Sequence, residues 1–156
     1  MKKKRRNKLT FTKVIMTLVT ISFIAFIFIH SSMPATASKA KSAGLTDILN
    51  DILAKLGFDI KFENNIIRKI AHFGEFFILG SLLTVTDRTY NRNIKKDFVN
   101  INFIGLITAV IDETIQLFVE GRAGMIQDVW IDFCGAFCGT CVVMLIILSI
   151  KAKHKK

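Results

Sequence analysis

Four long apolar runs constrain this chain of 156 residues more than any other feature of its sequence. They cover about residues 14–30, 66–85, 98–119 and 128–150. Each is close to the roughly 20 residues that a helix needs to cross a hydrocarbon core of about 30 Å. Membrane-spanning strands would alternate polar and apolar side chains at every second position, and the runs show no such alternation. The sequence therefore predicts an all-α, polytopic membrane protein built as a four-transmembrane-helix bundle.

The composition agrees with this class and argues against a nucleic-acid partner. Hydrophobic residues make up 51% of the chain, and the mean hydropathy is +0.44. The net charge of +10 is concentrated in short Lys and Arg blocks between the apolar runs. Such blocks are typical of membrane-topology signals rather than of a nucleic-acid groove.

The basic blocks also predict an orientation. They are the N-terminal MKKKRRNK, the segment DRTYNRNIKK and the C-terminal KAKHKK. Because basic loops stay on the cytoplasmic side, both termini are expected in the cytoplasm, with loops 31–65 and 119–127 outside. We expect a multi-pass protein of the bacterial cell membrane. The predicted regions are a basic cytoplasmic N-terminus, a membrane domain and a basic cytoplasmic tail, at residues 1–13, 14–150 and 151–156.

The first apolar run has a second interpretation. A basic start, an apolar stretch and the segment Ala35-Thr36-Ala37 resemble a signal peptide with its cleavage site. Cleavage there would leave the topology of the other three runs unchanged, and the sequence leaves this alternative open.

The first outer loop contains GLTDILNDILAKLG, in which the apolar residues fall on one helical face. Thr46 or Asp47 can begin this helix and Gly57 can end it. We expect a short amphipathic helix, either flat on the outer membrane surface or packed against its own bundle.

Polar and ionisable residues occur in the outer third of three predicted spans. An isolated charge at the middle of a membrane helix costs about 2.5–3.5 kcal/mol on insertion scales. These side chains must therefore face one another or trapped water, and we expect one shared polar cluster. Its members are Arg68, Lys69, His72, Glu75, Asp112, Glu113, Gln116, Asp128 and Asp132, with Arg122 in the loop before the last span.

Five carboxylates in this predicted cluster face two Arg, Lys69 and a histidine that can be neutral. Arg68 and Arg122 are the natural cationic partners of the acids. If burial is deep, some carboxylates should be protonated or a cation should be bound. A purely structural ion-pair network that fixes the helix register is the alternative. The Gly135 to Gly139 spacing, with Gly74 and Gly80 in the second run, predicts close helix packing.

The motifs RKIAHFGEF, DETIQ, GRAG and DVWIDFCGAFCG, in this order, resemble the VanZ-like family, as does the step at Ser31 to Pro34. That family comprises small bacterial membrane proteins, and its founding member is associated with low-level resistance to teicoplanin. Asp132 stands where the family often has Asn, which adds an acid. The resemblance implies these motif positions: Arg68, Lys69, His72, Glu75, Asp112, Glu113, Gln116, Arg122, Asp128 and Gly135.

Two functions follow as hypotheses. The first is a cell-envelope protein that binds a lipid-linked cell-wall intermediate or a lipoglycopeptide among the membrane lipids. Arg68, Lys69 and Arg122 would contact phosphate or carboxylate, and the acids would receive amines or hydroxyls.

The second is a membrane enzyme, a hydrolase or transferase acting on a lipid-linked substrate. His72 with Glu75 or Glu113 would serve as general base and orienting carboxylate. Alternatively, His72, Glu75, Asp112 and Glu113 would hold a divalent metal. The sequence contains no catalytic signature such as HExxH or GxSxG, so it assigns no metal and no cofactor.

Overall fold

The fold is that of a computed structural model, which describes the backbone of residues 2–58, 60–90 and 94–153. Within these ranges the chain forms α-helices and no strand, which confirms the all-α class. Several side chains on which the predicted orientation rests, those of residues 1–9, Arg92, Lys95 and 154–156, lie outside the described part. The helices are α1 (Lys2–Ser31), α2 (Ala35–Lys55), α3 (Asn64–Thr89), α4 (Ile94–Leu117) and α5 (Ile126–Lys153).

Three helical segments of the described chain are long and apolar enough to cross a membrane. They are Thr10–Ser31, Lys96–Leu117 and Ile126–Lys153, and they coincide with the first, third and fourth predicted runs. Helix α3 is not among them, because the charged side chains of its first three turns and of its last turn lower its mean hydropathy.

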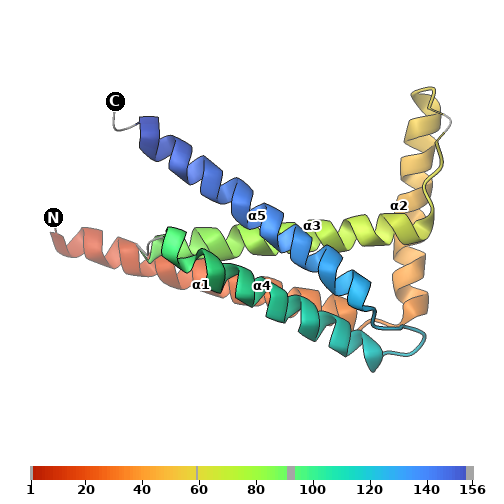
Figure 1. Ribbon diagram of the computed structural model, residues 1–156, viewed down its shortest axis with the longest axis horizontal. Helices are drawn as coiled ribbons and strands as arrows, with labels where there is room; N and C mark the ends of the chain where they lie inside the picture. Colours follow the sequence, from red (N-terminus) through yellow and green to blue (C-terminus); the bar gives the residue numbers. More distant parts are fainter. Residues whose placement is uncertain (1, 59, 91–93, 154–156) are drawn as a thin grey trace.

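Helix α3 occupies the centre of the molecule. It packs most extensively against α5 and also contacts α1, α4 and α2. Helices α1, α3 and α4 lie side by side, whereas α5 crosses them at an angle (Figure 1). The apolar core follows from this arrangement, since Phe76 and Leu79 of α3 are fully buried against Ile27 of α1 and Ala136 of α5.

Glycine residues set the close approach of α3 and α5. A Cβ added to Gly135 or Gly139 would overlap the backbone carbonyl of Phe73 or Phe77, and one on Gly80 would overlap that of Ala136. The predicted packing role of these glycines is thus confirmed. The prediction was wrong for Gly74, around which nothing lies within 4 Å of an added Cβ.

The bundle places polar side chains inside and large apolar side chains outside. Thr84, Thr140, Asp112 and Asp132 are almost completely buried. Many Phe, Ile, Leu and Val side chains are exposed along the helices instead. A soluble protein rarely exposes so much contiguous apolar surface, so this distribution suits a lipid environment.

Helix α2 lies across one end of the bundle, nearly perpendicular to α3 (Figure 1). It begins at Ala35, directly after Pro34, rather than at Thr46 or Asp47 as the sequence suggested. Pro34 is the N-cap of this helix, and its carbonyl accepts the backbone N–H of Ser38 (3.1 Å). Thr46 lies inside the helix and donates its hydroxyl to the carbonyl of Ser42 (2.7 Å).

Helix α2 is followed by a glycine in a left-handed conformation, and its apolar face is largely exposed. The helix stops at Lys55, and Gly57 follows with a φ of 82°, a conformation that favours glycine. Leu45, Ile48 and Ile52 are 56%, 60% and 48% exposed, so the bundle leaves much of this apolar face uncovered.

The glycine contacts predict a matched pair of substitutions. Gly139→Ala should lower the free energy of unfolding by about 1–3 kcal/mol, because its Cβ would displace α3 from α5. Gly74→Ala on α3 adds the same methyl group in open space and should change stability by less than about 0.5 kcal/mol. Denaturant unfolding of the two variants in detergent measures the difference. Equal effects would contradict the proposed α3–α5 packing.

Candidate functional site

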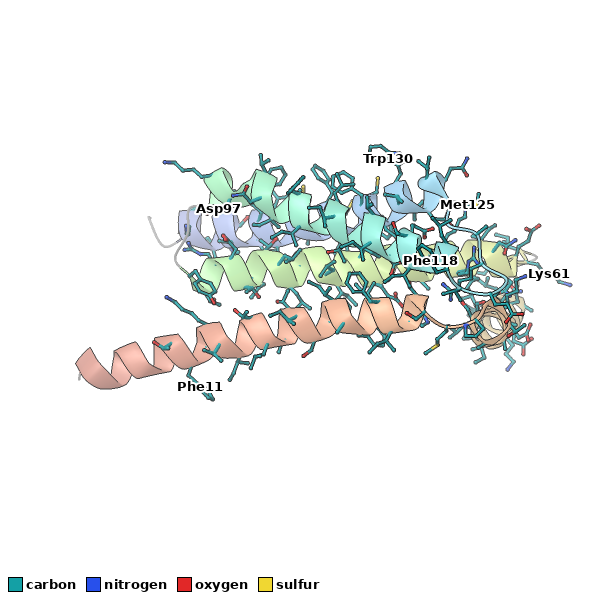
Figure 2. All side chains as sticks on the ribbon, turned by 90° about the horizontal axis from the view of Figure 1, so that it is seen from below. Phe11, Lys61, Asp97, Phe118, Met125 and Trp130 are labelled. Carbon is teal, nitrogen blue, oxygen red and sulfur yellow. The ribbon has the colours of Figure 1, made fainter. Side chains whose placement is uncertain are left out.

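The ten residues singled out by the sequence lie around the α2 end of the bundle, where α3 and α5 begin and α4 ends (Figure 1). Figure 2 shows Phe118, Met125 and Trp130 at this end, with Asp97 and Phe11 towards the opposite one. Two residues of α1 join the ten through contacts described below. We call the whole set the polar cluster: His30, Ser31, Arg68, Lys69, His72, Glu75, Asp112, Glu113, Gln116, Arg122, Asp128 and Asp132.

Asp112 lies at the centre of the polar cluster and is fully buried. The hydroxyl of Ser31 donates to its Oδ1 (2.5 Å), and the amide Nε2 of Gln116 donates to its Oδ2 (3.1 Å). Both carboxylate oxygens therefore have a fixed donor. The donors come from α1 and from α4 itself, and one of the oxygens lies within 4.8 Å of ligand atoms of His72 on α3 and Asp132 on α5.

Glu113 is 5% exposed and also has both oxygens occupied. Gln116 Nε2 donates to its Oε1 (3.0 Å), and the backbone N–H of Met125 donates to its Oε2 (2.9 Å). Gln116 thus bridges the two neighbouring acids, and Glu113 ties α4 to the turn that precedes α5.

The charged residues of α3 find partners on two different helices. Asp128 of α5 lies 3.4 Å from Lys69 Nζ and 4.0 Å from Arg68 Nη2. Glu75 pairs with His30 Nδ1 of α1 at 3.0 Å, not with an arginine as expected. The partner was missed because the sequence does not show which helix lies beside which.

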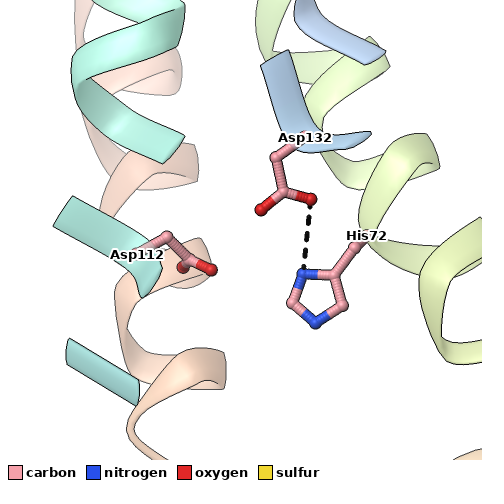
Figure 3. A group of neighbouring side chains, drawn as sticks. All are labelled: His72, Asp112 and Asp132. Atoms are coloured by element: carbon pink, nitrogen blue, oxygen red, sulfur yellow. Dashed lines mark ion pairs between the residues drawn. The ribbon is translucent and has the colours of Figure 1, made fainter. Parts of the chain in front are cut away.

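Asp132, His72 and Asp112 form the deepest part of the cluster (Figure 3). Asp132 is fully buried, and its Oδ1 lies 3.7 Å from His72 Nδ1. This distance is too long for a hydrogen bond. Both oxygens of Asp132 and the Nδ1 of His72 are buried without a hydrogen-bond partner. Each of the three residues offers one ligand atom, and these atoms lie within 4.8 Å of one another.

Arg122 lies in the turn between α4 and α5, outside the spans. It takes part in none of these ion pairs, and its Nε is buried without a hydrogen-bond partner. Burial, followed by the positive charge of Arg68, lowers the pKa of Arg122 from its usual value, while nearby carboxylates act in the opposite direction. The positive charge of Arg68 therefore acts on Arg122 in the same direction as burial.

His30 and Ser31 are the site residues that the sequence reasoning did not assign. They end α1, and the His30 ring also stacks on that of His72 with 6.5 Å between ring centroids. The polar step HSSMP at the end of a predominantly apolar run was the available signal. It was read as part of a family pattern and not as a contribution to the cluster.

A largely apolar groove of about 410 Å³ adjoins the polar cluster between α4 and α5. Trp130 of α5 forms part of the groove wall. Glu113 belongs to both the groove and the cluster. The lining residues are Leu106, Val110, Glu113, Thr114, Leu117, Gly124, Met125, Ile126, Val129 and Trp130.

The contacts also bear on the catalytic hypotheses. The carboxylate beside His72 is that of Asp132, whereas Glu75 faces His30 and Glu113 faces Met125. The sequence suggested four metal ligands, but the residues whose ligand atoms lie together in the described structure are His72, Asp112 and Asp132. The arrangement gathers metal-ligand atoms at His72, Asp112 and Asp132 and leaves the Nε of Arg122 buried without a hydrogen-bond partner.

These features define a class: an all-helical, membrane-type protein with a buried polar cluster at one end of its bundle. The VanZ/LLP1 family model matches residues 16–148, and the chain therefore belongs to this family. This agrees with the resemblance seen in the sequence motifs. No curated protein and no solved structure matches the chain.

Proposed function

We propose that this protein binds an amphiphile with an anionic head group at the outer leaflet of the bacterial cell membrane. The observation that carries the proposal is the shared position of Glu113. This residue lines the apolar groove between α4 and α5 and also belongs to the polar cluster. A molecule with a long apolar chain and a polar head would use both features at once.

Arg122 and Arg68 would receive the head group. Burial and then the positive charge of Arg68 lower the pKa of Arg122, and an anion bound beside Arg122 would offset both effects. Arg122 also keeps a buried Nε without a partner. A phosphate or carboxylate can accept two bonds from one guanidinium, so it satisfies both requirements. Lys69, which is 38% exposed, adds a third positive charge at the rim.

The groove would receive the apolar chain. Nine of its ten lining residues carry no charge, and Trp130 and Met125 offer polarisable surfaces to a prenyl or acyl chain. Lipid-linked cell-wall intermediates and lipoglycopeptides such as teicoplanin both combine a long apolar chain with an anionic group. Because the founding member of the family is associated with teicoplanin resistance, teicoplanin is one of the ligands that should be tested.

The proposal includes four membrane crossings. Helix α3 has 26 residues and would be about 39 Å long, which is enough to span. It lies among the three apolar spans, so they shield its charged side chains from lipid. The N-terminal end of α1 and the C-terminal end of α5 both lie at the side of the bundle away from α2 (Figure 1). The uncovered apolar face of α2 would then rest on the outer membrane surface.

The proposal also requires α1 to remain in the mature protein. Cleavage after Ala37 would remove His30 and Ser31, which pair with Glu75 and Asp112 inside the bundle. It would also remove Ile27, which is 1% exposed, from the apolar core. Both losses would leave buried groups without partners.

The topology makes a testable prediction. Reporter fusions after residue 156 should behave as cytoplasmic, and fusions at Phe58 as external. A chain with three crossings would change the C-terminal result, whereas cleavage of α1 would leave both reporters unchanged and would shorten the mature protein. An external C-terminal reporter would contradict the proposed four crossings, and a mature protein beginning near residue 38 would contradict retention of α1.

The ligand makes a second testable prediction, and Trp130 supplies the readout. It is the single Trp of the chain and lies in the groove, so its fluorescence should change saturably when polyprenyl phosphate binds. Arg122→Gln should weaken this binding by about 10-fold or more, since a charge-assisted hydrogen bond contributes about 1.5–3 kcal/mol. Arg88→Gln, the same change in the last turn of α3, is the matched control and should leave binding unchanged.

Further arms of this titration separate the alternatives. Polyprenol without its phosphate should bind much more weakly, and teicoplanin tests the lipoglycopeptide as ligand. Equal binding of the phosphate and the alcohol, or equal effects of Arg122→Gln and Arg88→Gln, would contradict the anionic-head proposal. Conversion of the phosphate to a new product would instead favour the enzyme alternative, for which the nearness of His72 to Asp132 is the supporting contact.

A further inference from the structure

Asp132 differs from the other acids of the polar cluster because both of its carboxylate oxygens are buried without a hydrogen-bond partner. It is fully buried on α5. Leaving a buried charged group without a partner costs more free energy than leaving a neutral group without one. Its carboxylate points toward His72, while Asp112 approaches from the other side (Figure 3). A positive charge bound between Asp132 and Asp112 would offset the negative charges of the two carboxylates.

We propose that His72, Asp112 and Asp132 bind one divalent transition-metal ion of the Zn²⁺ or Mn²⁺ type. One imidazole nitrogen and two carboxylate oxygens from three helices converge there, within 4.8 Å of one another. The ion would neutralise the two carboxylates and satisfy the unpartnered His72 Nδ1 and Asp132 oxygens. This goes beyond the proposed amphiphile binding and does not depend on it.

The distances fit an ion after a small contraction. Donor atoms about 2.0–2.2 Å from a common Zn²⁺ lie roughly 3.4 Å apart in a tetrahedral site. His72 Nδ1 and Asp132 Oδ1 are already 3.7 Å apart. Rotation of side chains toward an ion covers the remaining difference. Three protein ligands would leave a fourth position open, as in sites where the metal also contacts a water or a ligand.

Asp112 is held by neighbouring hydrogen-bond donors, as carboxylates that bind a metal usually are. Ser31 donates to one of its oxygens and Gln116 to the other, and each oxygen keeps a further lone pair. Carboxylates and imidazoles that bind metals are usually held in this way by neighbouring donors. The mixture of one nitrogen and two oxygens favours Zn²⁺ or Mn²⁺ over Mg²⁺, which prefers oxygen ligands alone.

The first experiment measures metal binding directly. The full chain, carrying an affinity tag without histidine, is stripped with a chelator, reconstituted in neutral lipid and dialysed against Zn²⁺ or Mn²⁺. The expected result is one ion per chain. Asp132→Asn and Asp112→Asn should each weaken binding by about 100-fold or more, and Ser31→Ala by about 10-fold. No ion bound by the wild type at equimolar metal would overturn the proposal.

Asp128→Asn is the matched control, because it removes the same charge one helical turn from Asp132 on α5. It should retain one ion per chain, since Asp128 pairs with Lys69 and Arg68. An equal loss in Asp128→Asn and Asp132→Asn would show a general charge effect and would overturn the assigned ligands. Arg122→Gln should also retain the ion, so a failure of amphiphile binding and a failure of metal binding are distinguishable.

A second measurement needs no variant and so does not depend on how well the variants fold. X-ray absorption of the Zn²⁺-loaded wild type should show nitrogen and oxygen ligands at about 2.0–2.2 Å, with one imidazole among them. A metal shell without imidazole would overturn the proposal.

Discussion

A carboxylate buried between packed helices has little water to solvate it, and the arrangement of this bundle depends on that constraint. Each buried acid must find a donor, a cation or a proton from the protein itself. Asp112 receives two donors, one of them from α1, and Glu113 receives a side-chain and a backbone donor. Asp128 and Glu75 are paired with basic side chains. The positions of α1, α3, α4 and α5 at this end of the molecule satisfy these requirements for four acids and leave both oxygens of Asp132 without a hydrogen-bond partner.

The central position of α3 follows from the same constraint. Its charged side chains make it too polar for lipid on all sides, and the other three long helices pack around it. Glycines at the α3–α5 contact then bring the two backbones close enough for His72 to face Asp132. Packing between small residues and pairing between polar residues therefore fix the same register.

The sequence was sufficient for the helical class and for the residues that gather at one end. Acids at positions such as Asp112 and Asp132 cannot face lipid at an acceptable cost, so their convergence follows from their depth alone. The identity of each partner does not follow, because it depends on the rotation and neighbours of every helix. His30 as the partner of Glu75 is an example. Ser31 was missed because a hydroxyl at the end of a span is equally compatible with water.

Two further differences between the sequence-based predictions and the structure, at the start of α2 and at Gly74, have local causes. Thr46 and Asp47 are common N-cap residues and so predicted the start of α2, whereas the helix begins at Ala35 with Pro34 as its N-cap. Gly74 lies one turn from close contacts but on a side of α3 that no backbone approaches. The groove at Trp130 has no signature in the sequence, since it arises from the angle between α4 and α5. The proposed binding of an amphiphile depends on that angle as much as on the charged residues.

The central claim is that side chains of different helices, including α1, meet in one buried cluster. A double-mutant cycle between Ser31 and Asp112, with Ser31→Ala and Asp112→Asn measured by unfolding in the presence of a chelator, tests it most directly. Because the two side chains share a buried hydrogen bond, the cycle should give a coupling free energy of at least about 1 kcal/mol. Additive effects, within about 0.3–0.5 kcal/mol, would show that α1 does not reach the cluster and would contradict the account.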